Sequence, residues 1–172
     1  MSSNKNLNNH VMRLQQIEQL LNSEIFTSEF KPADERIPLD QLFVHLNGDQ
    51  SEYLLELVYV PGLENQLENV KLLQFYVHIP GEVELSATED IKKLVLHLNV
   101  NTPLMGWGFQ EELELLYFRH ILVISDSSGE GNQAVIVQTV WLIFYLLESF
   151  YSTIKSIAMG EKHFEEVRDE AR

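Results

Sequence analysis

Cysteine is missing from the chain, and so are the motifs of the common enzyme families. With no cysteine in 172 residues, disulfide frameworks, thiolate metal sites and thiol catalysis are excluded. The sequence has no nucleophile elbow or zinc-protease helix, and Gly129-Glu130-Gly131 lacks the lysine that a phosphate-binding loop requires. Asp126, Ser128 and Glu130 do not follow the spacing of a calcium loop. These absences predict a protein that is not an enzyme and holds no cofactor.

Positive charge is scarce as well. The formal net charge is −14, and from Ile37 to Ile154 sixteen acids face four bases, which are Lys71, Lys92, Lys93 and Arg119. Nucleic-acid binding depends on Lys and Arg that neutralise phosphates, so a nucleic-acid partner is disfavoured. An anionic membrane surface is disfavoured for the same reason. The charge favours a basic or amphipathic protein segment as the partner.

Long apolar runs are also few. The N-terminus, Met1 to Leu7, is polar and has no signal-peptide core, so we expect a cytoplasmic protein. The most membrane-like stretch, Ala134 to Leu147, has fourteen residues and contains Gln138 and Thr139. A membrane helix needs about 20 residues. This stretch therefore predicts a buried helix in a protein that does not enter a membrane.

The composition is that of a folded globular protein, with 45% hydrophobic and 22% charged residues. The length is close to that of one typical domain. We therefore expect a single domain over residues 1–160 and a charged C-terminal tail or frayed helix over residues 161–172.

Hydrophobic periodicity predicts the elements of the first half. A stripe with spacings of three and four predicts a helix that ends near Asn22; its members are Leu7, Val11, Leu14, Ile17 and Leu21. Residues 41–46 and 71–79 alternate like strands with one core face, carried by Leu42, Val44, Leu46, Leu73, Phe75, Val77 and Ile79. The nearly all-apolar segment 53–60 predicts a central strand, joined to the first by a hairpin at Asn47-Gly48-Asp49.

The second half predicts a helix, two strands and a long helix. Ser86 and Glu89 have the spacing of a capping box before a helix that stops at Asn99. A short strand over 105–110, a longer strand over 113–124 and a helix from about 133 to 159 follow. The order is α-β-β-β-α-β-β-α. Grouped strands favour an antiparallel sheet with helices packed on it, so the predicted class is α+β.

The segment from Ser86 to Ile154 carries a pattern of glycine, aromatic and strand positions. It combines a helix ending in asparagine, a short strand opened by Gly-Phe, a long strand with Tyr and Arg, and a closing apolar helix; the residues are Ile91 to Asn99, Gly108, Phe109, Tyr117 and Arg119. This pattern resembles the YbjN-like bacterial domains and the type III secretion chaperone-like fold. The resemblance implies a dimeric cytoplasmic protein that binds segments of a partner or contributes to regulation.

Three strands each carry an aromatic residue and a histidine two positions apart: Phe43 with His45, Tyr76 with His78, and Phe118 with His120. Each pair shares one face of its strand. If the strands are neighbours, the three imidazoles could bind zinc and activate water, which would make the chain a metal-dependent hydrolase. The same residues could instead form a surface for a protein segment, or pack in the ordinary way under a helix.

The long helix is apolar around its whole circumference, which one sheet face cannot cover. Its aromatic residues are Trp141, Phe144 and Tyr145. The first helix, a second subunit or a bound protein could cover the remainder. We therefore expect a homodimer that acts as a non-enzymatic, chaperone-like or regulatory protein-binding module.

Overall fold

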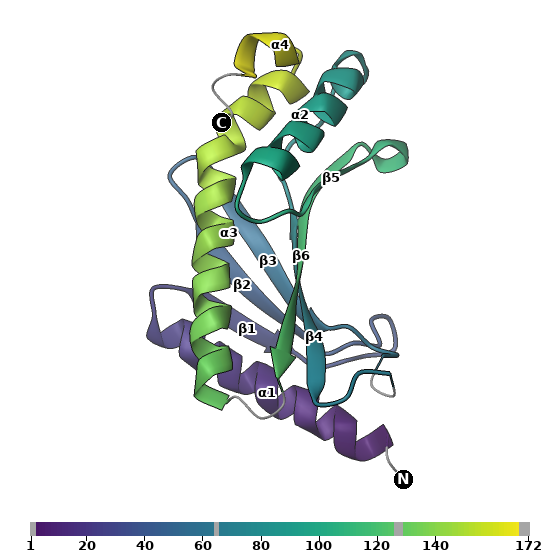
Figure 1. The fold of residues 1–172 in the computed structure, drawn as a ribbon, viewed down its shortest axis with the longest axis vertical. Helices are drawn as coiled ribbons and strands as arrows, with labels where there is room; N and C mark the ends of the chain where they lie inside the picture. The colour runs from purple at the N-terminus through teal and green to yellow at the C-terminus, as the bar shows by residue number, and fades with distance from the viewer. Residues whose placement is uncertain (1–2, 64–65, 126–128, 169–172) are drawn as a thin grey trace. The chain divides into compact units, whose positions relative to one another are not determined.

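The protein, described by a computed structural model over residues 3–63, 66–125 and 129–168, is built on one antiparallel sheet with helices. The sheet has six strands in the order β1-β2-β3-β4-β6-β5 (Figure 1). The elements are α1 (Ser3–Ser23), β1 (Thr27–Lys31), β2 (Gln41–Asn47), β3 (Glu52–Tyr59), β4 (Val70–His78), η1 (Leu85–Ala87), α2 (Thr88–Asn101), β5 (Trp107–Gln110), η2 (Glu111–Leu113), β6 (Leu115–Ser125), α3 (Gly129–Ala158) and α4 (Phe164–Val167). The predicted α+β class is confirmed.

The predicted core faces are also confirmed. The alternating positions of β2 and β4 are buried, namely Leu42, Val44, Leu46, Leu73, Phe75 and Val77. β3 lies between β2 and β4, as expected of a central strand, and the turn before it is closed by a hydrogen bond from Gly48 N to Ser51 O of 2.9 Å. Periodicity of two therefore predicted these strands and their faces.

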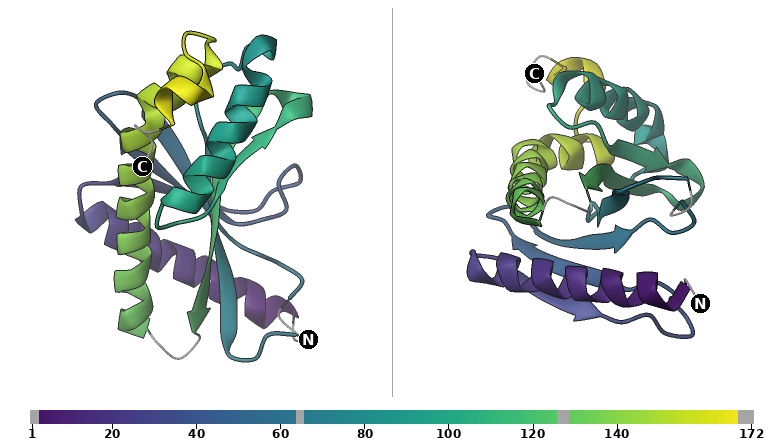
Figure 2. Two further views of the ribbon diagram at one scale, coloured as in Figure 1. Left: turned by 45° about the horizontal axis from the view of Figure 1, so that its top comes forward. Right: turned by 60° about the horizontal axis from the view of Figure 1, so that its bottom comes forward.

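The predicted order lacks one strand and one helix. β1 has no apolar alternation, because the position that points to the core is Ser28, which is 8% exposed. At the other end, the segment predicted to be a charged tail or frayed helix contains α4, whose Phe164 and Val167 are buried. Both views of Figure 2 show α4 beside α2. These apolar side chains make the segment part of the fold as far as the structure describes it, to residue 168.

The predicted capping box is wrong. The 3₁₀ turn η1 precedes α2, and the N-cap of α2 is Ala87, which has no side-chain cap. Ser86 lies inside that turn, and its hydroxyl donates to the Glu84 carboxylate at 3.4 Å. The spacing of Ser86 and Glu89 was therefore present without the backbone geometry that a capping box needs.

The chain contains two compact units. The N-terminal unit contains Met1–Leu46, Leu54–Phe75 and Ile121–Trp141. The C-terminal unit contains Asn47–Tyr53, Tyr76–His120 and Leu142–Arg172. Because the segments of the two units interleave along the chain, neither unit corresponds to a continuous stretch of sequence.

Candidate functional site

Two of the three aromatic–histidine pairs lie on accessible strand faces. In the N-terminal unit, Phe43 is half-buried under the ammonium group of Lys31, which lies 4.8 Å from the ring centre, and His45 is exposed. In the C-terminal unit, Tyr76 is half-buried and His78 is exposed. Each imidazole therefore reaches solvent beside an aromatic ring, as predicted for these two strands.

The third pair points the other way. Tyr76 stacks on Tyr117, with ring centres 5.7 Å apart, so the next residue of β6, Phe118, faces the opposite side of the strand. Phe118 is 0% exposed and packs edge-on against Trp107 at 5.1 Å. The prediction that Phe118 belongs to an accessible binding surface is therefore wrong. β6 carries apolar residues on both faces, so its sequence could not show which face is inside.

The three histidines do not form a metal site. Within residues 3–63, 66–125 and 129–168 no group of three or more His, Cys, Asp or Glu side chains is placed to hold a metal ion. His120 is half-buried, and its burial lowers its pKa, although a hydrogen bond with the Met105 backbone acts in the opposite direction. The geometry gives the hydrolase hypothesis no support.

Of the three residues that do not follow the spacing of a calcium loop, Asp126 and Ser128 lie outside the described residues. The long helix begins earlier than its predicted start near residue 133, because the backbone of α3 is helical from Gly129. A helical backbone at this position does not form the glycine loop of a phosphate-binding site.

The long helix α3 is less buried than predicted. Gly131–Ala158 is long and apolar enough to cross a membrane, and 33% of its most apolar stretch is buried. The core helix of a soluble protein can have the same length and composition, and the structure is compatible with a soluble protein. In the N-terminal unit Trp141 is half-buried against Phe26, with ring centres 4.6 Å apart. In the C-terminal unit Phe144 is half-buried and Tyr145 is 66% exposed. Only Tyr145 among the three presents most of its ring to solvent.

Glu148 of α3 holds the turn between β2 and β3. Its carboxylate accepts hydrogen bonds from the backbone N–H groups of Asp49 (2.9 Å) and Gln50 (3.3 Å) and from the Tyr53 hydroxyl (3.0 Å). A Cβ atom at Gly48 would clash with this carboxylate, so a larger residue there would displace Glu148 from the turn. Burial and then the bond to Glu148 raise the pKa of Tyr53. With its acceptors engaged, Glu148 serves the fold rather than a ligand.

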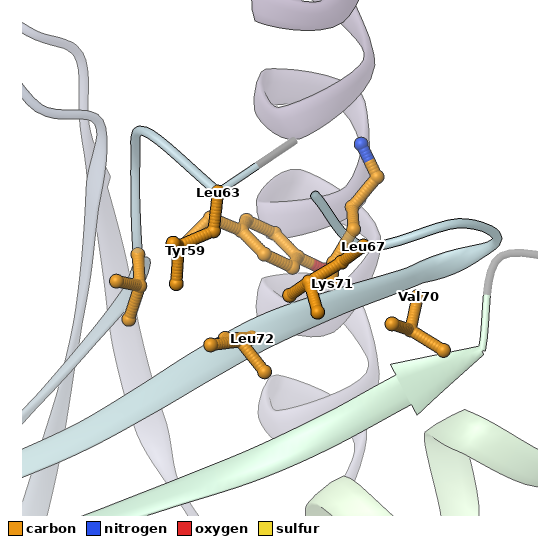
Figure 3. Close-up of a pocket in the computed structure, with 7 residues that line it drawn as sticks. Tyr59, Leu63, Leu67, Val70, Lys71 and Leu72 are labelled. Atoms are coloured by element: carbon orange, nitrogen blue, oxygen red, sulfur yellow. The ribbon is translucent and has the colours of Figure 1, made fainter. Parts of the chain in front are cut away.

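Among the described residues of the N-terminal unit, two hollows are lined by no Ser, His, Asp or Glu. One lies where β3 leads into β4 and is mainly apolar, with Leu63, Leu67, Val70 and Leu72 around the Tyr59 ring (Figure 3). The other, of about 540 Å³ including its open mouth, is lined by Ile residues and by Arg13, Gln16, Asn132 and Gln133. Neither contains a nucleophile with an adjacent base.

The outer edge of β1 is covered by α1. In the N-terminal unit, the N–H of Ser28 donates to Asn22 Oδ1 at 2.7 Å, and the N–H of Phe30 donates to Glu18 Oε1 at 2.8 Å. These two residues alternate with Thr27, Glu29 and Lys31. The backbone N–H and C=O groups of those three residues therefore point toward β2 in the antiparallel ladder. An added strand would have to displace two helix side chains from this edge.

The outer edge of β5 is covered at one position. Arg119 N donates to Gly106 O at 2.8 Å, so the alternation of an antiparallel ladder directs the backbone groups of Trp107 and Phe109 away from β6. At Trp107, Asn99 of α2 bonds both groups: its amide donates to Trp107 O at 2.8 Å and its carbonyl accepts from Trp107 N at 3.0 Å. No side chain among the described residues bonds the outward backbone groups of Phe109 in this way.

Four exposed apolar side chains of the C-terminal unit lie on α2 or next to β5 in the chain. Leu96 and Val100 lie one turn apart on α2 and are 69% and 82% exposed, while the core side of the helix is formed by other residues. Met105, before β5, is 70% exposed, and Leu113, after it, is 63% exposed. The fold leaves this surface uncovered.

Compared with known proteins, the chain matches no family model, no curated protein and no solved structure. The resemblance to YbjN-like domains and secretion chaperones therefore stays a prediction. Sequence reasoning had singled out Asn99 only as the end of a helix and had missed Glu18, Asn22 and Glu148. Asn99 lies in the last turn of α2, which ends at Asn101, and an asparagine near a helix end can bond the backbone that follows, so the signal was present.

Proposed function

We propose that this protein is a non-enzymatic protein-binding module of the cytoplasm that engages segments of a partner protein. The observation that carries the proposal is the exposure of three large apolar side chains of the C-terminal unit, Leu96, Val100 and Met105. Apolar side chains that the fold leaves exposed one helical turn apart, as Leu96 and Val100 are, support an interaction site. The acidic chain, with a net charge of −14, favours a partner segment that carries basic residues.

The test changes the surface without touching the core. Leu96→Glu combined with Val100→Glu places two charges on exposed positions, so the circular dichroism spectrum should stay unchanged while proteins cross-linked to the wild type in its own cells are lost. Leu54→Glu with Val123→Glu is the matched control, because both residues are exposed apolar residues of the N-terminal unit. An identical set of cross-linked proteins for the first variant and the wild type would contradict the proposal.

We further propose that a second copy of the chain covers the outer side of α3 around Tyr145. Tyr145 is 66% exposed, and burying such a ring in an interface contributes about 1.5–3 kcal/mol. Tyr145→Glu should therefore give a folded monomer, measured by light scattering for mass and circular dichroism for fold.

The control for the dimer is Ser152→Glu, an exposed polar position of the same helix, which should leave the mass unchanged. Trp141→Glu should instead destabilise the fold, because the Trp141 ring already contacts Phe26 at 4.6 Å. A wild-type mass of 20.0 kDa at micromolar concentration would overturn the dimer proposal.

A further inference from the structure

The backbone register of β5 leaves one residue of the sheet edge open. Arg119 N donates to Gly106 O, whereas Gly106 N donates to Asn99 Oδ1. In the alternation of this ladder the pairs Trp107–Phe118 and Phe109–Leu116 are therefore the non-bonded ones. Both groups of Trp107 are held by Asn99. After Phe109 the chain turns into η2, where Glu111 O already accepts from Glu114 N at 3.1 Å. The open backbone groups are therefore the N–H and C=O of Phe109.

Asn99 shows how this edge can be paired. Its carboxamide bonds the N–H and C=O of Trp107 at 3.0 and 2.8 Å, which is what one residue of an added antiparallel strand would do. An extended segment could continue from this carboxamide and bond Phe109 in the same manner. The position of Asn99 fixes where such a segment begins, since it excludes pairing at Trp107.

Charge selects the occupant. Glu111, Glu112 and Glu114 follow β5 and are exposed, and Lys92, which pairs with Glu111 at 2.8 Å, is shared with Glu89 at 2.9 Å. In an antiparallel pair of two β5 edges centred on Phe109, Glu111 and Glu112 of one copy would lie opposite Trp107 and Gly106 of the other, so a second copy offers these glutamates no counter-ion. A segment with lysine or arginine is attracted instead.

We propose that the open edge of β5 binds an extended segment of a partner protein, with apolar and basic residues in alternation, by strand addition at Phe109. This inference rests on the proposed protein-binding function and names its partner. The apolar residues of the segment lie beside Met105 and Leu113, which flank the strand and are 70% and 63% exposed. Its basic residues face the glutamates after β5. Strand addition gives affinity through backbone bonds and specificity through the alternating side chains.

The experiment follows backbone amide hydrogen exchange of the full chain while a blocked peptide of alternating lysine and valine is added. We expect exchange at Phe109 N–H to slow about tenfold or more, since that amide gains a hydrogen bond, and exchange at Phe30 N–H, already bonded to Glu18, to stay unchanged. A peptide of the same charge with proline in place of its central valine should protect the Phe109 amide less, because proline cannot donate to the Phe109 carbonyl and the pair loses one of its two bonds.

Two variants separate backbone pairing from side-chain contact. Phe109→Pro removes the outward N–H without removing a bond of the β6 ladder and should weaken peptide binding about tenfold or more. Phe109→Ala keeps that N–H and should weaken it less. Circular dichroism checks that both variants fold, and if Phe109→Pro does not, the exchange comparison between the two peptides decides the matter.

Three outcomes would overturn the proposal: peptide binding without protection of Phe109, equal binding of both peptides, or protection of Phe109 by a second copy at higher protein concentration. If strand addition fails while Leu96→Glu with Val100→Glu still loses its cross-linked proteins, the protein-binding function stands and only the β5 site is wrong. If both fail, the function fails with it.

Discussion

The two edges of the sheet differ in how their outward backbone groups are bonded. At β1 the N–H groups of Ser28 and Phe30 are both bonded by side chains of α1. At β5 the groups of Trp107 are bonded by Asn99, and Phe109 has no such side chain. An unpaired edge strand is a site of association, so side chains of neighbouring helices, rather than strand length, decide which edge of this protein can pair.

The largest expected loss of stability concerns the aromatic side chains that pack β5 against β6. Phe118→Ala removes a ring that is 0% exposed and contacts Trp107 at 5.1 Å, so we expect the free energy of unfolding to fall by about 3–5 kcal/mol. Urea unfolding measures it. His78→Ala is the control, since this exposed residue ends a neighbouring strand and its loss should change little. A small effect of Phe118→Ala would mean that β5 does not depend on this contact.

Removing the cover of β1 should make the two edges alike. Glu18→Ala with Asn22→Ala leaves the N–H groups of Ser28 and Phe30 without their side-chain acceptors, which should lower stability by about 1–3 kcal/mol. The uncovered edge should also make the chain associate as its concentration rises. Light scattering over a concentration series measures this association. Gln19→Ala with Ser23→Ala is a control on the same helix, and an association equal to that of this control would contradict the prediction.

A smaller effect is expected at the indole of Trp107. Its Nε1 is the buried side-chain polar atom for which no hydrogen-bond partner exists among the described residues. Trp107→Phe removes this donor and keeps an aromatic ring against Phe118 and Phe150, so the loss of packing is offset in part. We expect thermal unfolding to show a stability change of less than about 1 kcal/mol. A loss as large as that of Phe118→Ala would show that the indole makes a bond that the structure lacks.

The smallest effect concerns the ion pair that links α4 to α2. His163 Nδ1 lies 2.8 Å from Asp90 Oδ2, and this hydrogen bond raises the pKa of His163 and lowers that of Asp90. The histidine part of the contribution is present below its ordinary pKa of 6.5 and is lost as the pH rises through the raised value. The aspartate part is present above 3.8 and is lost as the pH falls.

The free energies of unfolding of the wild type and of His163→Gln should therefore differ most between pH 3.8 and pH 6.5, and they should converge at alkaline pH. Glu161→Gln, an exposed acid of the same segment, controls for a change of net charge alone. A difference that grows with rising pH would contradict the assignment.

Sequence reasoning succeeded where one face of an element is buried and the other is not. β2 and β4 alternate in this way, so their core faces were predicted correctly. It failed at Phe118, because β6 is apolar on both faces and its neighbours decide which face is inside. It failed at β1, whose inward residue is Ser28, and at the segment after residue 160, where Phe164 and Val167 were too few to give a periodic signal. For the candidate site, the outward direction of Phe109 depends on the pairing register, which a single sequence does not specify.

The bonds of Glu148 also bear on the rate at which the protein folds. The carboxylate reaches the N–H groups of Asp49 and Gln50, which are 99 and 98 positions earlier in the chain. Closing a loop of this length lowers the entropy of the chain before the bonds form, and contacts between distant positions slow folding. During synthesis from the N-terminus, the turn at Gly48 emerges long before α3. The hairpin of β2 and β3 must therefore wait for the last long helix before its turn reaches the final set of hydrogen bonds.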